Sequence, residues 1–339
     1  MRVLMLVQQI DERDWLRAFI VDWVREMAAH VERIDVLTLE RGEAALPTNV
    51  TVRSLGKERG KNRLREFAAF HRGMMDFAPR ADVIFSHMTP RYTLLAAPYA
   101  ALFRKPQVLW FTHRNPSRQL RLALPLLWRA TTATPDSFPI ASPKVRALGH
   151  GVDTEFYAPG IPSPLEESAA YILHVARLMP IKHQATLLRA LPHVPGAHGV
   201  IVGDVPAGQE IHADYAKGLR ALAGELGAAD RVTFTGGLLA PQVRAWYQRA
   251  AVAINLSPPG LFDKSALESM ASGVPTIVSS AAFDALLGEH APLLRIASPE
   301  DVDGLAERLR ALLALSPEER AAIGRALRER VVAEHSLKR

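Results

Sequence analysis

The chain has 339 residues, 48% of them hydrophobic and 22% charged, with a formal net charge of +6. This length favours two domains, and the composition is typical of a globular protein whose partners are anionic, such as nucleotides, anionic lipid head groups or nucleic acid. Because the chain has no cysteine, disulfides and thiolate metal sites are excluded, which fits a cytoplasmic enzyme.

The first residues, Met1 to Val7, are apolar, but Gln8, Gln9 and two acids follow soon after. A signal peptide needs a longer apolar region and a small-residue cleavage site, so this run predicts a buried first strand. A membrane-spanning helix needs about 18 consecutive apolar residues, and we expect none because no such run occurs.

The first 150 residues alternate short apolar runs with amphipathic segments. The predicted strands are 3–7, 34–39, 50–55, 83–85, 108–111, 131–134 and 145–148, and the predicted helices are 14–29, 63–77, 92–103 and 118–128, the last interrupted at Pro125. Such alternation predicts a parallel sheet covered by helices on both faces.

From residue 151 to 168 the periodicity is lost and proline and glycine gather, which predicts a linker. The alternation then restarts, with predicted strands 171–175, 199–202, 232–235, 251–256 and 276–278 and predicted helices 182–191, 210–226 and 241–250. Ser298 and Ser316 are predicted helix caps, because each precedes a proline and has an acid three residues on. The sequence therefore predicts two doubly wound, Rossmann-like α/β domains, 1–150 and 169–339, that face each other across a cleft.

The stretch from Ser257 to Ser279 carries the strongest chemical pattern. Its loop leads into a predicted helix that contains Glu268 and ends near Gly273. A helix N-terminus presents free backbone N–H groups, which suit a phosphate. Glu268 suits two vicinal ribose hydroxyls, and the alternative is a surface glutamate on an ordinary helix.

Other candidates also follow predicted strands. Arg177 and Lys182 suit a diphosphate, and the alternative is two solvated surface cations. His113 suits a sugar hydroxyl or a proton transfer, and a histidine satisfied within its own loop is an equal alternative. His87 occupies a similar place but is a weaker candidate, and His150 is more typical of a structural residue.

Three motifs lie between residues 149 and 275 of the sequence. They are Arg177-x4-Lys182, the segment Gly149-His150-Gly151-Val152-Asp153 with Phe156, and the run from Leu267 to Pro275. Together they resemble the retaining, GT-B-fold glycosyltransferases of family 4. The match is strong from about Gly149 to Ser280. In the first domain it is weaker and rests mostly on His113.

The resemblance implies a donor that is a nucleoside-diphosphate sugar, held mainly by the second domain, with no metal or other cofactor. Arg177 and Lys182 would neutralise the departing diphosphate, Glu268 would bind the ribose, and His113 would contact the donor sugar. The turn before the helix would hold phosphate or sugar through its candidates Gly260, Phe262, Asp263, Lys264, Ser265 and Ala266. The acceptor, a glycan or a lipid-linked molecule, would bind mostly to the first domain.

Three features depart from the family pattern. The family commonly has a sugar-contacting glutamate eight residues before Glu268, where this sequence has Gly260. We expect either that Asp263 takes over part of this role or that amides alone hold the sugar. Gln8-Gln9-Ile10-Asp11 replaces the glycine-rich turn after the first strand. The sequence also stops at Arg339, about where the last helix would cross back to the first domain, so we expect a very short crossing or a truncated sequence.

Basic residues lie beside apolar ones in two segments, 57–74 and 114–129. They suit docking on an anionic membrane, where a lipid-linked acceptor would lie, and ordinary solvated charge is the alternative. Nucleic-acid binding is not expected, because no basic run has interleaved aromatics. We expect a cytoplasmic protein, at the inner face of the membrane if these segments bind lipid. A catalytically inactive nucleotide-sugar-binding relative and a GT-B sugar-nucleotide epimerase stay open as alternatives.

Overall fold

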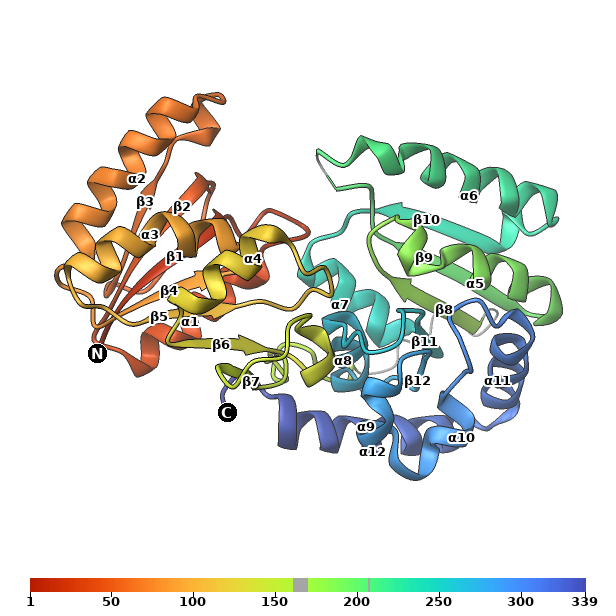
Figure 1. Cartoon of the computed structure of the whole chain (residues 1–339). Helices are drawn as coiled ribbons and strands as arrows, with labels where there is room; N and C mark the ends of the chain where they lie inside the picture. The colour runs from red at the N-terminus through yellow and green to blue at the C-terminus, as the bar shows by residue number, and fades with distance from the viewer. Residues whose placement is uncertain (161–169, 207) are drawn as a thin grey trace. The chain divides into compact units, whose positions relative to one another are not determined.

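The computed structural model describes residues 1–160, 170–206 and 208–339, which form two compact units, Met1–Gly149 and His150–Arg339 (Figure 1). In the described residues, one sheet of seven parallel strands belongs to the first unit and one of five to the second. The predicted pair of doubly wound α/β domains is thereby confirmed. Residues 161–168 of the predicted linker lie outside the described residues, whereas 151–160 pack within the second unit, where Val152 pairs with Ser336.

The first unit has the strand order β3-β2-β1-β4-β5-β6-β7, so the order reverses between β1 and β4. Its strands are β1 Arg2–Ile10, β2 Arg33–Arg41, β3 Val50–Ser54, β4 Val83–His87, β5 Gln107–Trp110, β6 Arg129–Thr132 and β7 Val145–Ala147. Its helices are α1 Phe19–His30, α2 Arg63–Phe77, α3 Pro90–Leu102 and α4 Arg118–Ala123. Helix α1 begins later than predicted, because Asp14 Oδ1 accepts hydrogen bonds from the N–H groups of Leu16 and Arg17, at 2.8 and 2.7 Å, and holds a turn there.

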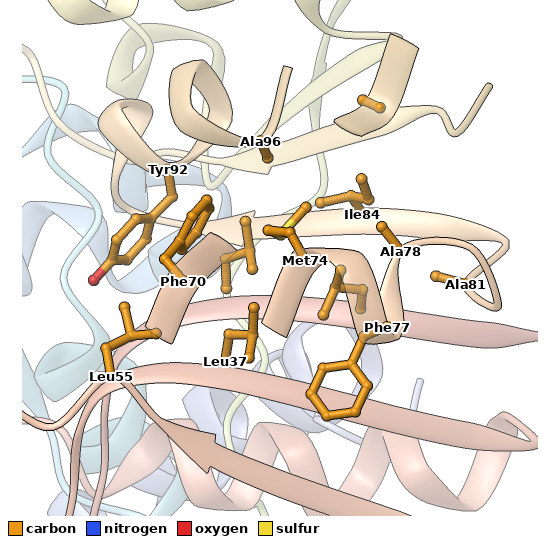
Figure 2. Close-up of a cluster of buried hydrophobic side chains, with 13 residues drawn as sticks. Leu37, Leu55, Phe70, Met74, Phe77, Ala78, Ala81, Ile84, Tyr92 and Ala96 are labelled. Atoms are coloured by element: carbon orange, nitrogen blue, oxygen red, sulfur yellow. The ribbon is translucent and has the colours of Figure 1, made fainter. Parts of the chain in front are cut away.

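The core of the first unit lies on both faces of its sheet, because alternate residues of a strand point to opposite sides. Leu4 and Leu6 of β1 pack under α2 and α3, whereas its Val3, Met5 and Val7 pack under α1. Figure 2 shows the first of these layers, in which α2 sends its apolar side chains toward the strands. The set includes Leu37, Phe70, Met74, Phe77 and Ile84. Helices α2, α3 and α4 therefore cover one face of the sheet and α1 covers the other (Figure 1).

The second unit has the strand order β10-β9-β8-β11-β12, with the reversal between β8 and β11. Its strands are β8 Ala170–Val175, β9 Ala197–Val202, β10 Val232–Gly236, β11 Val252–Asn255 and β12 Thr276–Val278. Its helices are α5 Gln184–Ala190, α6 Ala213–Glu225, α7 Ala240–Arg249, α8 Lys264–Ala271, α9 Asp284–Leu287, α10 Ala291–Leu294, α11 Val302–Ala314 and α12 Pro317–His335. Within the described part of the chain, no helix combines the length and apolarity needed to cross a membrane.

The two predicted serine caps had different outcomes. Helix α12 starts as predicted, because Ser316 Oγ accepts from the Glu319 N–H and the Glu319 carboxylate accepts from the Ser316 N–H, at 3.2 and 2.7 Å. The cap predicted at Ser298 is wrong. Residues 298–301 form a turn, and Asp301 caps α11 by accepting a hydrogen bond from the Gly304 N–H at 2.9 Å.

Candidate active site

The reversal of strand order in the second unit locates the candidate site. Open α/β sheets bind ligands outside the carboxyl ends of their strands, at the point where the order reverses. The loop after β8 carries Arg177 and Lys182, and the loop after β11 carries Ser257 and Asp263. The topology therefore brings both loops to the expected ligand edge.

Lys182 and Asp263 form an ion pair at this edge. The Lys182 ammonium donates to Asp263 Oδ2 and to Ser257 Oγ, the latter at 3.1 Å. Asp263 Oδ2 also accepts from the Ser257 hydroxyl and, at 3.2 Å, from Asn255 Nδ2. One carboxylate oxygen thus receives three hydrogen bonds, whereas Asp263 Oδ1 receives none from the described residues.

The pair is shielded from water, with the Lys182 side chain 10% exposed and that of Asp263 24% exposed. Burial acts to raise the pKa of Asp263. The Lys182 charge and the hydrogen bonds from Lys182, Ser257 and Asn255 outweigh burial and lower this pKa to about 2. Asp263 is therefore ionised at neutral pH, and the Lys182 charge is balanced within the protein.

His174, on β8, is fully buried near this pair. In the residues that the structure describes, neither of its ring nitrogens has a hydrogen-bond partner. Burial and then the Lys182 charge lower the pKa of His174 to about 3, so the imidazole is neutral. Sequence analysis missed His174 and Asn255. The available signal was a polar residue inside an otherwise apolar strand.

Helix α8 starts beside the ion pair. Asp263 occupies the N-cap position with extended backbone angles, but within the described part of the chain its side chain makes no capping hydrogen bond. The carboxylate turns instead to Lys182. The Ala266 N–H donates to the Asp263 carbonyl at 3.2 Å. The helix N-terminus thus keeps a positive end that its own N-cap side chain does not satisfy, which suits a phosphate.

The turn before α8 explains the glycine at position 260. Gly260 has φ of +79°, in the left-handed region that favours glycine, and the Leu261 N–H closes the turn on the Pro258 carbonyl at 3.1 Å. A glutamate at position 260 would be strained in this turn. The Phe262 side chain is buried against Phe283, with ring centroids 4.5 Å apart, so only its backbone is placed for a ligand.

Glu268, in the middle of α8, is largely shielded, with a side chain 14% exposed. Lys264 Nζ lies 3.8 Å from Glu268 Oε1, one turn earlier in the helix. The Tyr247 hydroxyl donates to the Ser265 carbonyl at 3.0 Å, and burial followed by the Glu268 charge raises the pKa of Tyr247. Glu268 therefore does not lie on a fully exposed helix face.

Helix α12 packs against the C-terminal end of α8. A Cβ atom on Gly324 would fall 1.8 Å from the Gly273 carbonyl oxygen, so the two backbones are in direct contact. Arg328 of α12 donates to the carbonyl of Ala271, the last residue of α8, and to that of Tyr157 at 2.9 Å. Both contacts fix the position of α8 in the second unit.

In the first unit, His113 lies in an exposed loop after β5. Its Nδ1 accepts a hydrogen bond from the Asn115 N–H at 3.0 Å, so the neutral ring carries its proton on Nε2. His87, at the end of β4, is buried against Phe19 and Trp23, with ring centroids 5.9 and 5.4 Å away. Over the described ranges, no group of three or more His, Asp or Glu side chains is placed to hold a metal ion.

Comparison with known families finds a match within the second unit. A family model described as glycosyl transferases group 1 matches residues 169–315, which include the Lys182–Asp263 pair and Glu268. Residues 169–315 are therefore similar to the glycosyl transferases group 1 family. The predicted resemblance to the GT-B-fold glycosyltransferases is confirmed.

Curated proteins similar to this chain include mycobacterial enzymes. A GDP-mannose-dependent alpha-(1-6)-phosphatidylinositol monomannoside mannosyltransferase of Mycobacterium tuberculosis is 31% identical over 205 residues, covering 55% of this chain and 51% of that protein. A D-inositol 3-phosphate glycosyltransferase of Mycobacterium avium is 29% identical over 191 residues, covering 54% and 44%. The chain thus spans about half the length of these relatives.

Solved structures extend the likeness over both units. Anabaena Alr3699/HepE in complex with UDP-glucose has a TM-score of 0.78 and 18% identity, covering 99% of this chain and 96% of that one. WaaG, a glycosyltransferase involved in lipopolysaccharide biosynthesis, has a TM-score of 0.68 and 16% identity, covering 100% and 96%. At these identities the likeness establishes the fold.

Proposed function

We propose that the chain is a retaining, metal-independent glycosyltransferase that moves a sugar from a nucleoside-diphosphate sugar to a glycan or lipid-linked acceptor. The observation that carries the proposal is the Lys182–Asp263 pair beside the start of α8, at the strand reversal of a family-matched domain. Cations and helix N–H groups at one point suit a diphosphate that leaves with its charge.

The main task of the site is to stabilise the diphosphate as it leaves. The bond between the anomeric carbon and the diphosphate oxygen breaks while a bond to the acceptor hydroxyl oxygen forms. Negative charge gathers on the departing diphosphate, which takes up the proton that the acceptor hydroxyl releases. An ammonium has three N–H donors, and in the described residues Lys182 uses two of them, on Asp263 and Ser257. We assign the third to a phosphate oxygen, with Arg177 as the second cation.

The other candidate residues bind the remaining parts of the donor. Glu268 accepts hydrogen bonds from the ribose hydroxyls, the N–H groups at the start of α8 hold phosphate, and His113 contacts the donor sugar. The names of similar proteins include a GDP-mannose-dependent enzyme and complexes with UDP or UDP-glucose, which supports a donor based on GDP or UDP. The phosphatidylinositol monomannoside named for one relative supports a lipid-linked acceptor.

A binding screen followed by turnover tests this proposal. A thermal-shift assay with UDP, GDP and ADP identifies the base, because a ligand that binds the native state raises the apparent stability. With the matching sugar nucleotide, we expect Arg177→Ala, Glu268→Ala and His113→Ala each to lower kcat/KM by about 100-fold. Glu307→Ala serves as the control, because this acid on α11 has a side chain 67% exposed.

Three results would contradict the assignment in different ways. Unchanged turnover in all three variants would reject the site. Tight nucleotide binding without donor hydrolysis or transfer on a broad acceptor panel would favour the inactive relative. Conversion of a free sugar nucleotide into its epimer would favour the epimerase.

A further inference from the structure

We propose that Asn255 and Ser257 are positioning residues that lock Asp263 so that its outer oxygen, Oδ1, accepts hydrogen bonds from hydroxyls of the donor sugar. This inference rests on the proposed glycosyl transfer and concerns how the donor sugar is chosen. Asp263 then does the work expected of the glutamate that Gly260 replaces, from a different place in the turn.

The anchoring of the carboxylate is the first step. All three hydrogen bonds that the Asp263 carboxylate receives from the described residues converge on Oδ2, from Asn255, Ser257 and Lys182. Two of these donors are rigid, because Asn255 ends strand β11 and both Asn255 and Ser257 are buried, at 2% and 0% exposure. Ser279 Oγ further donates to the Ser257 carbonyl at 2.7 Å. The direction of the carboxylate is therefore fixed by the sheet.

The chemistry of the outer oxygen is the second step. Asp263 is ionised, so both of its oxygens only accept hydrogen bonds. Oδ1 receives none within the described ranges, and the side chain keeps 24% of its surface exposed. Such an oxygen can accept a hydrogen bond from a sugar hydroxyl.

Charge decides which part of the donor Asp263 meets. A carboxylate repels phosphate oxygens and attracts hydroxyl protons, so Asp263 cannot face the diphosphate directly. Lys182 can bind both groups. Its ammonium contacts Asp263 and keeps one N–H that no described residue accepts. We place the diphosphate on the ammonium and the sugar on Oδ1. Asp263 therefore favours sugar binding while it reduces the charge that Lys182 offers to phosphate.

Asp263 has opposite effects on the binding of sugar and of phosphate, and removing its charge tests both. Asp263→Asn keeps the shape of the side chain but removes its charge. We expect its Kd for the sugar nucleotide to rise by about tenfold, because the three inner donors hold the amide oxygen and the outward Nδ2 group cannot accept a hydrogen bond from a sugar hydroxyl. We expect its Kd for the nucleoside diphosphate without sugar to fall, because Lys182 is no longer neutralised. Calorimetric titration of both ligands measures the two shifts on one folded protein.

The positioning residues are tested in the same assay. Ser257→Ala removes one anchor, and we expect a several-fold weaker Kd for the sugar nucleotide with an unchanged Kd for the nucleoside diphosphate. Ser257→Thr keeps the hydroxyl and should restore sugar-nucleotide binding. Ser269→Ala is the matched control, because this buried hydroxyl of α8 donates to the Ala266 carbonyl at 2.8 Å and makes no hydrogen bond to Asp263.

The outcomes separate this inference from the proposed function. If the wild-type protein binds neither ligand, both are overturned. If it binds both, but Asp263→Asn and Ser257→Ala shift the two Kd values by the same factor or shift neither, the inference alone is overturned. Opposite shifts in Asp263→Asn support it, because a general loss of folding would weaken both ligands together.

Discussion

At the scale of single residues, His174 makes the second unit sensitive to acid. Its pKa is about 3 in the folded protein and about 6.5 when unfolded, so between these values only the unfolded state binds the proton. Stability therefore falls as the pH is lowered through this window, by about 1.4 kcal/mol per pH unit from this residue. The Asp263 contribution is separate, because it is lost only as the pH falls from 3.8 towards 2.

His174→Met should flatten this dependence. Methionine is similar in size and removes two ring nitrogens that are unpartnered in the described residues, so we expect no loss of stability at pH 7. Urea denaturation of both proteins at several pH values from 4.5 to 7 measures the difference, and the other histidines contribute equally to both. Equal slopes for the two proteins would show that His174 does not carry the acid sensitivity.

The same residues show how far sequence reasoning reaches. Lys182 and Asp263 could each be proposed for the site, because each follows an apolar strand before a helix. Their pairing could not be predicted, because it joins residues 81 positions apart and depends on β8 and β11 being neighbours in the sheet. Asn255 and His174 were missed because one polar residue in a buried strand gives no sign of what it contacts.

At the scale of elements, the long helices and buried strands were predictable and the exceptions are local. Helix α2 spans the predicted residues, because Asn62 caps it and its apolar residues recur with helical spacing. At α11 both Ser298 and Asp301 are good caps, and only the turn between them decides the start. The four-residue helices α9 and α10 were missed because one turn has no periodicity to detect.

The contact between α8 and α12 predicts opposite effects for two glycine substitutions. Gly324→Ala forces a Cβ against the Gly273 carbonyl, so we expect the free energy of unfolding to fall by about 1–3 kcal/mol. Gly218→Ala, in α6, meets nothing within 4 Å and should raise it by about 0.5–1 kcal/mol through better helix propensity. Urea denaturation measures both, and a shift of the same sign would contradict the close approach of the two helices.

At the scale of the whole molecule, the net positive charge is confined to one part of the chain. Residues 57–129 contain 14 Lys and Arg against 4 Asp and Glu, whereas the rest contains 27 against 31. The entire positive net charge therefore belongs to the segment that includes α2, α3 and α4, which cover one face of the first sheet (Figure 1). The same segment exposes large apolar side chains: Leu64, Phe67, Met75, Leu102, Leu122, Leu126 and Trp128.

A surface that is both cationic and apolar suits an anionic lipid bilayer. We expect the protein to sediment with vesicles that contain phosphatidylglycerol and not with pure phosphatidylcholine vesicles, and to be released as salt screens the charges. Replacing Leu122, Leu126 and Trp128 together by serine should weaken this binding by about tenfold or more, because each loses buried apolar area. Ile211→Ser is the matched control, since Ile211 is 86% exposed in the second unit. Equal binding by the triple variant, or equal binding to both vesicle types, would assign these side chains to ordinary solvated surface and leave a soluble glycan as the acceptor to test.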